Sequence, residues 1–157
     1  MIRKGTFEDL NTAMDIFDEG RLHMRNEGNF NQWINGYPKR EMIQDDISKG
    51  NFYVVEREGE VIAAFTYILG EDPTYAYIEG KWSNEKPYGT VHRIGKREKA
   101  KGIMKEVMDF CLTKESTIRI DTHHDNVTMR SVLEKLGFQY CGIIYVEDGS
   151  PRDAYIY

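Results

Sequence analysis

The amino-acid sequence predicts an α/β fold, in which a mixed sheet of about seven strands is flanked by about four helices. The chain has 157 residues, enough for one buried core and too few for two ordinary domains. Strand patterns alternate with helix patterns in its second half, and this order favours parallel strands. Hairpin patterns elsewhere favour antiparallel neighbours. We therefore expect residues 1–157 to form a single domain, with helices on both faces of its sheet.

The first half of the chain is expected to begin with a short strand and two helices. Residues 2–4 fit a strand, and Thr6 opens a sequence typical of a helix N-terminus with an acidic first turn. Apolar residues at helical spacing continue this helix to about Met24. Pro38 is expected at the first position of a second helix, which Gly50 ends.

A β-hairpin and a long loop follow these helices in the prediction. Residues 52–57 and 61–69 are rich in β-formers, and Glu58 with Gly59 supplies the turn between them. Residues 71–87 are polar and contain two prolines, so we expect a loop with a short extended or helical piece.

Two strand-to-helix units and a final hairpin complete the chain. Residues 90–95 fit a strand that leads through a basic loop into a helix starting near Gly102. Residues 117–122 fit another strand, and a His-His-Asp-Asn turn leads from it into a helix capped by Gly137. The last strands are expected at residues 138–146 and 153–157.

Charge and hydrophobicity exclude several classes of function. The formal net charge is −5, so the surface as a whole does not attract nucleic acid. No apolar run approaches the ~20 residues that span a bilayer, and the N-terminal segment lacks the apolar core of a signal peptide. The two cysteines do not make a disulfide framework. These features favour a cytoplasmic protein that binds neither nucleic acid nor membrane.

Residues 96–102, KREKAKG, join a strand to a helix and predict an anion site. The first N–H groups of a helix have no intrahelical partner, and the helix dipole favours negative charge there. Lys99 and Lys101 add cations, and Gly102 lets the backbone approach a ligand closely. A solvated basic loop is the alternative, because the segment is neither a Walker motif nor a dinucleotide fingerprint. Residues 123–126 also follow a strand, so both segments lie where ligands bind in such sheets.

The basic loop and the last helix resemble two motifs of the general N-acetyltransferase (GNAT) superfamily. The family's pyrophosphate loop, Q/R-x-x-G-x-G/A, corresponds to Lys99 through Met104, with its central glycine at Gly102. The segments HRI, DTHHDN and CGIIYVEDGSPRDAY resemble one bacterial subgroup of this family. The resemblance covers essentially the whole chain and implies the acyl-CoA N-acyltransferase fold. A second family segment, N-x-x-A…Y-x-K-x-G-F, corresponds to Asn126, Met129, Leu133, Lys135, Gly137 and Phe138.

The resemblance implies that acetyl-CoA is the acyl donor. The backbone from Arg93 through Ile94 to Gly95 would pair with the pantetheine arm, which Asn126 would also reach. Met104 departs from the family pattern, because it is bulky where the backbone would meet the ligand. The N–H groups implied at the pyrophosphate are those of Lys99, Ala100, Lys101, Gly102, Ile103 and Met104.

The implied activity is that of an N-acetyltransferase without a metal. It would move the acetyl group to an amine of a small molecule or peptide, by direct transfer in a ternary complex, and a homodimer is left open. A CoA-binding module without transferase activity is the alternative, because Leu133 stands where many family members have a tyrosine that protonates the leaving thiolate. A nucleic-acid-binding domain is a second alternative, which the acidic net charge disfavours.

The candidate bases lie on two strands that should be neighbours in the sheet. Amide formation from a thioester requires a base for the ammonium group. His92, Asp121 and His123 are the candidates, because imidazole exchanges protons near neutral pH. Structural pairing of Asp121 with His92 or Arg93 is the alternative.

The candidate acids replace the missing tyrosine of the family pattern. Tyr145 is expected to protonate the thiolate, and Tyr140 is a second candidate. The thiolate could also leave without an acid.

Other conspicuous side chains have structural interpretations. His123 and His124 would rarely share a metal ion, because neighbours on a strand point to opposite faces. Trp82 is expected to anchor the core of a loop. Trp33 and Tyr37 either do the same or form a wall of the acceptor pocket, where an aromatic face would suit a cationic or planar amine.

Overall fold

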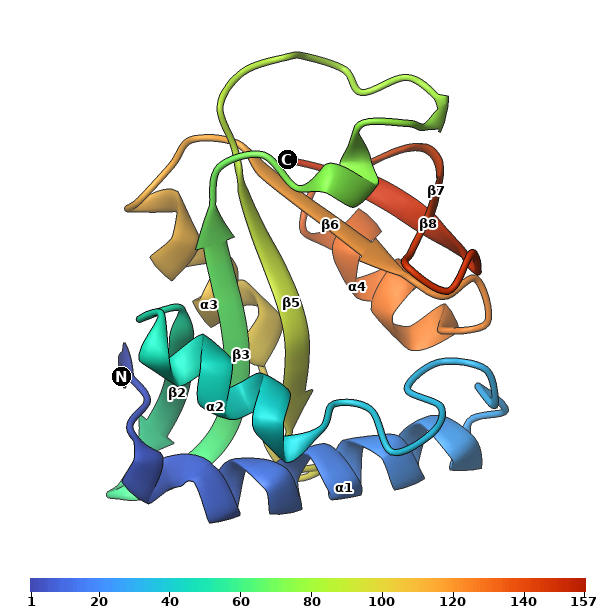
Figure 1. The fold of residues 1–157 in the computed structure, drawn as a ribbon. Helices are drawn as coiled ribbons and strands as arrows, with labels where there is room; N and C mark the ends of the chain where they lie inside the picture. The colour runs from blue at the N-terminus through green and yellow to red at the C-terminus, as the bar shows by residue number, and fades with distance from the viewer.

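A computed structural model describes residues 1–157 as an eight-stranded mixed sheet with helices on both faces (Figure 1). The sheet order is β1-β2-β3-β5-β6-β8-β7-β4. The strands are β1 (Ile2–Lys4), β2 (Phe52–Arg57), β3 (Glu60–Leu69), β4 (Glu79–Gly80), β5 (Gly89–Lys96), β6 (Ile118–Thr122), β7 (Gln139–Tyr145) and β8 (Pro151–Ile156). The helices are α1 (Leu10–Asn26), α2 (Arg40–Ser48), α3 (Ile103–Leu112) and α4 (Val127–Lys135). Short 3-10 turns lie at Phe7–Asp9 and Pro73–Tyr75.

The mixed α/β architecture confirms the fold expected from the sequence, with one strand more than the estimate of seven. The additional strand, β4, is only two residues long and lies inside the segment expected to be a loop with a short extended or helical piece. It pairs with β7 at the edge of the sheet, where Gly80 faces Gly142. A Cβ atom at Gly80 would lie 2.2 Å from the carbonyl oxygen of Cys141. Glycine therefore permits a close contact that residue patterns alone did not reveal.

Three apolar clusters hold the layers together. Helices α1 and α2 cover one face of the sheet, where Phe17 and Ile43 pack with Val54 and other residues of β2 and β3. Helices α3 and α4 pack on the opposite face, in a larger cluster that includes Val107 and Leu133. Segment 70–88 arches over the far half of the sheet (Figure 1) and covers β7 and β8. No helix is both long and apolar enough to cross a bilayer.

The start of α2 differs from the expectation for Pro38. The peptide bond from Tyr37 to Pro38 is cis, and the helix begins two residues later, at Arg40. The backbone is still turning before this point, since Trp33, Asn35 and Gly36 all have positive φ. Segment 27–39 is therefore a structured loop rather than a direct lead into the helix.

The middle of the sheet contains its one parallel pair, β5 and β6, and these two strands diverge. They pair only at Gly89 with Ile118 and at Thr90 with Arg119. Beyond Thr90, β5 continues to Lys96 and remains paired only with β3. Two strands that separate in the middle of a sheet leave a gap between them, and side chains of both border it.

Candidate functional site

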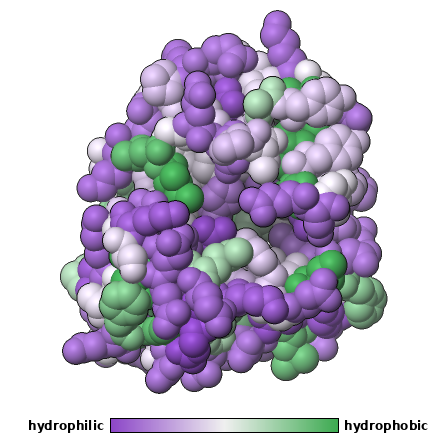
Figure 2. Space-filling view, viewed as in Figure 1, coloured by the Kyte–Doolittle hydropathy of each residue, from purple (hydrophilic) through white to green (hydrophobic).

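A cavity of about 480 Å³ lies where β5 and β6 diverge. The face of the molecule seen in Figure 2 is hollowed near its centre, and hydrophilic side chains border the hollow. Four parts of the chain line the cavity besides the two strands: the end of α1 with segment 32–42, residues 68–74, the N-terminal turn of α4, and residues 146–152. Among its lining residues are His92, Arg93, Ile94, Asp121 and Asn126, which the sequence had singled out.

In this cavity His92 is hydrogen-bonded to Asp72, a residue that sequence reasoning missed. The distance from His92 Nε2 to Asp72 Oδ2 is 2.8 Å, and both side chains are largely buried. Asp72 also accepts hydrogen bonds from the backbone N–H and the hydroxyl of Thr74, at 2.9 and 2.7 Å. Burial alone would raise the pKa of Asp72, but the bonds from His92 and Thr74 lower this pKa from 3.8 to about 2.

We expect the Asp72 carboxylate to stabilise the fold at neutral pH and to lose this effect in acid. Its pKa is lower in the folded chain than in the unfolded chain. The gain is therefore complete above pH ~4 and disappears as the pH falls through ~2. The shift corresponds to ~2 kcal/mol. Asp72→Asn should lower the free energy of unfolding at pH 7 and flatten its decline in acid, as measured by urea unfolding.

Asp109→Asn is the control for this prediction, because Asp109 is exposed and pairs only with Lys105 on α3. Surface pairs of this kind contribute little to stability. An acid decline in Asp72→Asn as steep as that of the wild type would contradict the prediction.

Asp121 is bound by Tyr75, which was not among the partners considered for it from the sequence. Its Oδ2 accepts a hydrogen bond of 2.6 Å from the hydroxyl of Tyr75, a fully buried side chain. It forms no ion pair with His92 or Arg93. Burial raises the pKa of Asp121, and the fields of His92 and Arg152 only partly oppose this rise. An uncharged carboxyl is therefore favoured at this position more than at an ordinary aspartate.

Arg93 pairs with Asp46 of α2 instead. Its Nε and Nη2 atoms donate to the two oxygens of Asp46 at 2.8 and 2.9 Å, and its Nη1 donates to the Tyr37 hydroxyl at 3.3 Å. The residue has a φ of 50° and lies in a bulge of β5. This strained backbone is held by the buried, bidentate ion pair. Bulges beside active sites commonly change the direction of side chains. Ile94, the residue that follows Arg93, lines the cavity.

The side-chain position of Gly95 points away from the cavity, toward α1. A Cβ atom at this position would lie 2.8 Å from the ring of Phe17. Its role is to let α1 pack closely against β5, while its backbone continues the strand.

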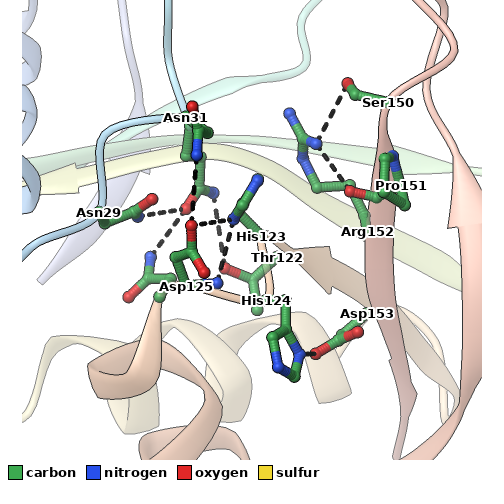
Figure 3. A network of polar contacts seen from close by, with 12 residues as sticks. Asn29, Asn31, Thr122, His123, His124, Asp125, Ser150, Pro151, Arg152 and Asp153 are labelled. Carbon is green, nitrogen blue, oxygen red and sulfur yellow. Dashed lines mark hydrogen bonds and ion pairs between the residues drawn. The ribbon is translucent and has the colours of Figure 1, made fainter.

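A polar network connects segment 27–37 to the start of α4 (Figure 3). Gln32 Oε1 accepts hydrogen bonds from the amide groups of Asn29 and Asn126 at 2.9 and 3.0 Å. Asn126 in turn caps α4, since its Oδ1 accepts from the N–H of Met129 at 3.0 Å. Arg25 fixes the same segment by donating to three of its carbonyl groups. The wall of the cavity is therefore preorganised by hydrogen bonds that cross between distant parts of the chain.

The two adjacent histidines lie on opposite sides of the chain (Figure 3). His123 Nδ1 accepts a hydrogen bond of 3.0 Å from the N–H of Asp125, and burial lowers the pKa of this histidine. His124 Nδ1 contacts Asp153 at 2.9 Å. Neither histidine lines the cavity beside His92. No group of three or more His, Cys, Asp or Glu side chains is arranged to hold a metal ion.

The tyrosines expected as acids are outside the cavity. Tyr145 is 37% exposed, and its hydroxyl donates to Glu79 on β4. Tyr140 is 54% exposed and lines a separate, smaller hollow. Leu133 is fully buried in the core. Tyr37 is the one tyrosine among the lining residues, and it had been considered as an anchor or a pocket wall.

The basic loop between β5 and α3 is ordered by Lys96 within it and by Glu19 of α1. Lys96 Nζ donates to the carbonyl groups of Arg97, Glu98 and Ala100 at 3.4, 3.3 and 3.0 Å. Glu19 of α1 accepts from the N–H of Glu98 at 2.6 Å. Lys96 is thus a structural cation within the loop, whereas Lys99 is 70% exposed and pairs only with an exposed carboxylate, that of Glu60, at 3.6 Å.

The N-terminus of α3 offers free backbone donors. Residues 101–105 donate no backbone hydrogen bond to another backbone group. Gly102 has a φ of 70°, and nothing lies within 4 Å of the position of a Cβ atom there. The side chain of Met104 is buried in the core cluster, so its bulk points away from these donors. The segment therefore keeps the properties of an anion site, and Met104 does not block it.

Solved structures with the same fold are acetyltransferases. A GNAT-family acetyltransferase from Streptococcus agalactiae 2603 is 32% identical, with a TM-score of 0.90 over 99% of this chain and 93% of that chain. GNAT-family acetyltransferases from Listeria monocytogenes 4b F2365 and Bacillus cereus ATCC 10987 share the fold at 18% and 17% identity. Their TM-scores are 0.72 and 0.65, and each match covers 100% of this chain and 93% and 95% of theirs. No protein-family model and no curated protein matches the sequence.

Proposed function

Because this chain belongs to the GNAT acetyltransferase family, whose enzymes use acetyl-CoA, we propose that it moves an acetyl group from acetyl-CoA to an amine by direct transfer in a ternary complex. The observation that carries the proposal is the cavity between β5 and β6, with the His92–Asp72 pair on its wall. A cavity at the switch point of a sheet, lined by a titratable pair, is the usual site of chemistry in such folds.

The donor is expected to lie along β5 and the loop that follows it. The free N–H groups at the start of α3 and the exposed Lys99 and Lys101 would bind the pyrophosphate. The backbone at Arg93 and Ile94, which β6 does not pair, would bind the pantetheine arm. Acetyl-CoA supplies the activated acetyl thioester. This part of the proposal is supported by the room around Gly102 and by the buried side chain of Met104.

We assign the role of base to His92. A carboxylate only accepts hydrogen bonds, so His92 Nε2 carries the hydrogen that faces Asp72. Nδ1 of the neutral ring then has the free lone pair that takes a proton from the ammonium group of the acceptor. The amine nitrogen forms a C–N bond with the acetyl carbon and loses its second proton to solvent, the C–S bond breaks, and the sulfur takes up a proton. Asp72 is a positioning residue that fixes the tautomer of His92.

We assign the proton for the sulfur to Tyr37. Its hydroxyl accepts from Arg93 Nη1 at 3.3 Å, which leaves its own O–H free to donate. Tyr37 lines the cavity, whereas Leu133, Tyr140 and Tyr145 do not. Tyr37→Phe should therefore lower kcat and leave acetyl-CoA binding unchanged.

An acceptor screen monitored by free-thiol release tests the proposal. Polyamines, amino sugars, amino acids and N-terminal peptides would be compared with a reaction that contains no acceptor. We expect at least one class to release CoA thiol at a rate that depends on His92. Binding of acetyl-CoA without acceptor-dependent release in any class would instead favour a CoA-binding module without transferase activity, which the buried Leu133 suggests.

A further inference from the structure

Arg152 is a guanidinium group in the cavity that no carboxylate neutralises. It is the second residue of β8 and is partly buried in the cavity wall. Its Nη1 donates to the carbonyl of Pro151 at 2.8 Å and to the hydroxyl of Ser150 at 3.2 Å. No carboxylate oxygen lies within 4.0 Å of Arg152, although Asp148 is close in sequence. The carboxylate of Asp148 is bound by the N–H and hydroxyl of Ser150 instead.

The other arginine of the cavity shows what the free edge of Arg152 can bind. Arg93 uses its Nε and Nη2 atoms together to hold both oxygens of Asp46. The same two atoms of Arg152 have no hydrogen-bond acceptor in the protein. Because Nη1 already fixes the plane of the group, this edge is preorganised for a planar, two-oxygen anion such as a carboxylate.

The other charges of the cavity exclude a purely anionic ligand. Asp72, Glu147 and Asp148 line it together with Arg152. A carboxylate alone would gain Arg152 and be repelled by the acidic residues, whereas a molecule with both an ammonium and a carboxylate group satisfies both kinds of charge.

We propose that the acceptor is an amino carboxylic acid. Its carboxylate is bound by the Nε–Nη2 edge of Arg152, and its amine is presented to His92. The proposal rests on the transferase activity proposed above and names the substrate class of the same cavity. Arg152 is then the residue that determines specificity, because it discriminates an acid from its amide.

Matched acceptor pairs test this inference. A panel of α-, β- and γ-amino acids would be compared with the corresponding carboxamides and with diamines, in the thiol-release assay. We expect kcat/KM for the best acid to exceed that of its amide at least ~10-fold, since losing one partner of a buried charge pair is costly. Arg152→Gln should raise KM for the acid and remove the difference between acid and amide, and Arg152→Lys should restore part of it. Arg40→Gln, an exposed arginine at the start of α2, is the matched control.

Calorimetry with CoA-saturated protein provides a second readout that does not depend on turnover. The acid should bind to the wild type and bind at least ~10-fold more weakly to Arg152→Gln. Equal or better use of amides or diamines would overturn this inference while leaving the transferase proposal intact. Absence of acceptor-dependent thiol release, with Arg152-dependent binding of acids preserved, would overturn the transferase proposal instead. Absence of any Arg152-dependent binding of acids would overturn the inference.

Discussion

Acetyl-CoA at one hundred times its Kd should raise the Tm of the protein by roughly 5–10 °C, and Gly102→Glu should abolish this shift. Binding at that ratio contributes about 2.7 kcal/mol, and each kcal/mol corresponds to roughly 2–4 °C for a chain of this size. The substitution places a carboxylate at the free N–H groups of α3, where the pyrophosphate is expected. Differential scanning fluorimetry measures the shift for both proteins.

Two further variants separate the charge from the backbone strain. Gly102→Ala carries the same strain of a positive φ without the charge, so it should lower Tm and keep most of the acetyl-CoA shift. Gly70→Glu introduces the same carboxylate at another open glycine, which has a φ of 103°. Gly70 follows the C-terminal end of β3, whereas the basic loop lies beside the N-terminal end of this strand. It should keep the full shift. An undiminished shift in Gly102→Glu would show that the anion site is elsewhere.

His92→Ala should lower kcat/KM for the acceptor by roughly 10²–10⁴-fold, because it removes the proposed base. The Kd for acetyl-CoA should stay within about twofold of the wild type, since no proposed contact to the donor involves this side chain. Initial rates of thiol release measure kcat/KM, and calorimetry measures the Kd for acetyl-CoA. His123→Ala is the matched control, because His123 lies outside the cavity and should leave kcat/KM nearly unchanged.

The coupling between His92 and Asp72 can be measured in the same assays. Asp72→Asn should reduce kcat, and its effect should largely vanish in the His92→Ala background, because Asp72 acts through the imidazole. Additive losses in the double variant would mean that the two residues act independently. Loss of acetyl-CoA affinity in His92→Ala would point to a structural role for His92 instead.

The fold was predictable because its elements have local signals. The unit from β5 through the basic loop to α3 follows from a β-rich run, a glycine-containing cationic turn and an apolar stripe at helical spacing. The gap between β5 and β6 was not predictable, since it arises from pairing that stops after Thr90. The bulge at Arg93 likewise depends on a buried partner, Asp46, that lies far away in the sequence.

The candidate site was predictable only in part. His92 and Asp121 were recognised by residue type on neighbouring strands, Asn126 was implied by the family resemblance, and the structure brings all three to one cavity. Asp72 gave no such signal, because an Asp-Pro pair in an irregular segment is typical of an ordinary turn. Tyr145 had been expected at the site, but β7 directs it to Glu79.

Calorimetric titration with acetyl-CoA and with acetylpantetheine, which lacks the phosphates, tests most directly whether the loop before α3 holds the donor. The two molecules share the acetyl thioester and the pantetheine arm, and acetyl-CoA adds the pyrophosphate assigned to residues 101–105 together with the phosphorylated adenosine. We predict that acetyl-CoA binds at least ~10²-fold more tightly, because each charge-assisted hydrogen bond contributes about 1.5–3 kcal/mol. Equal affinity for both molecules, or no binding of acetyl-CoA at millimolar concentration, would contradict the assignment.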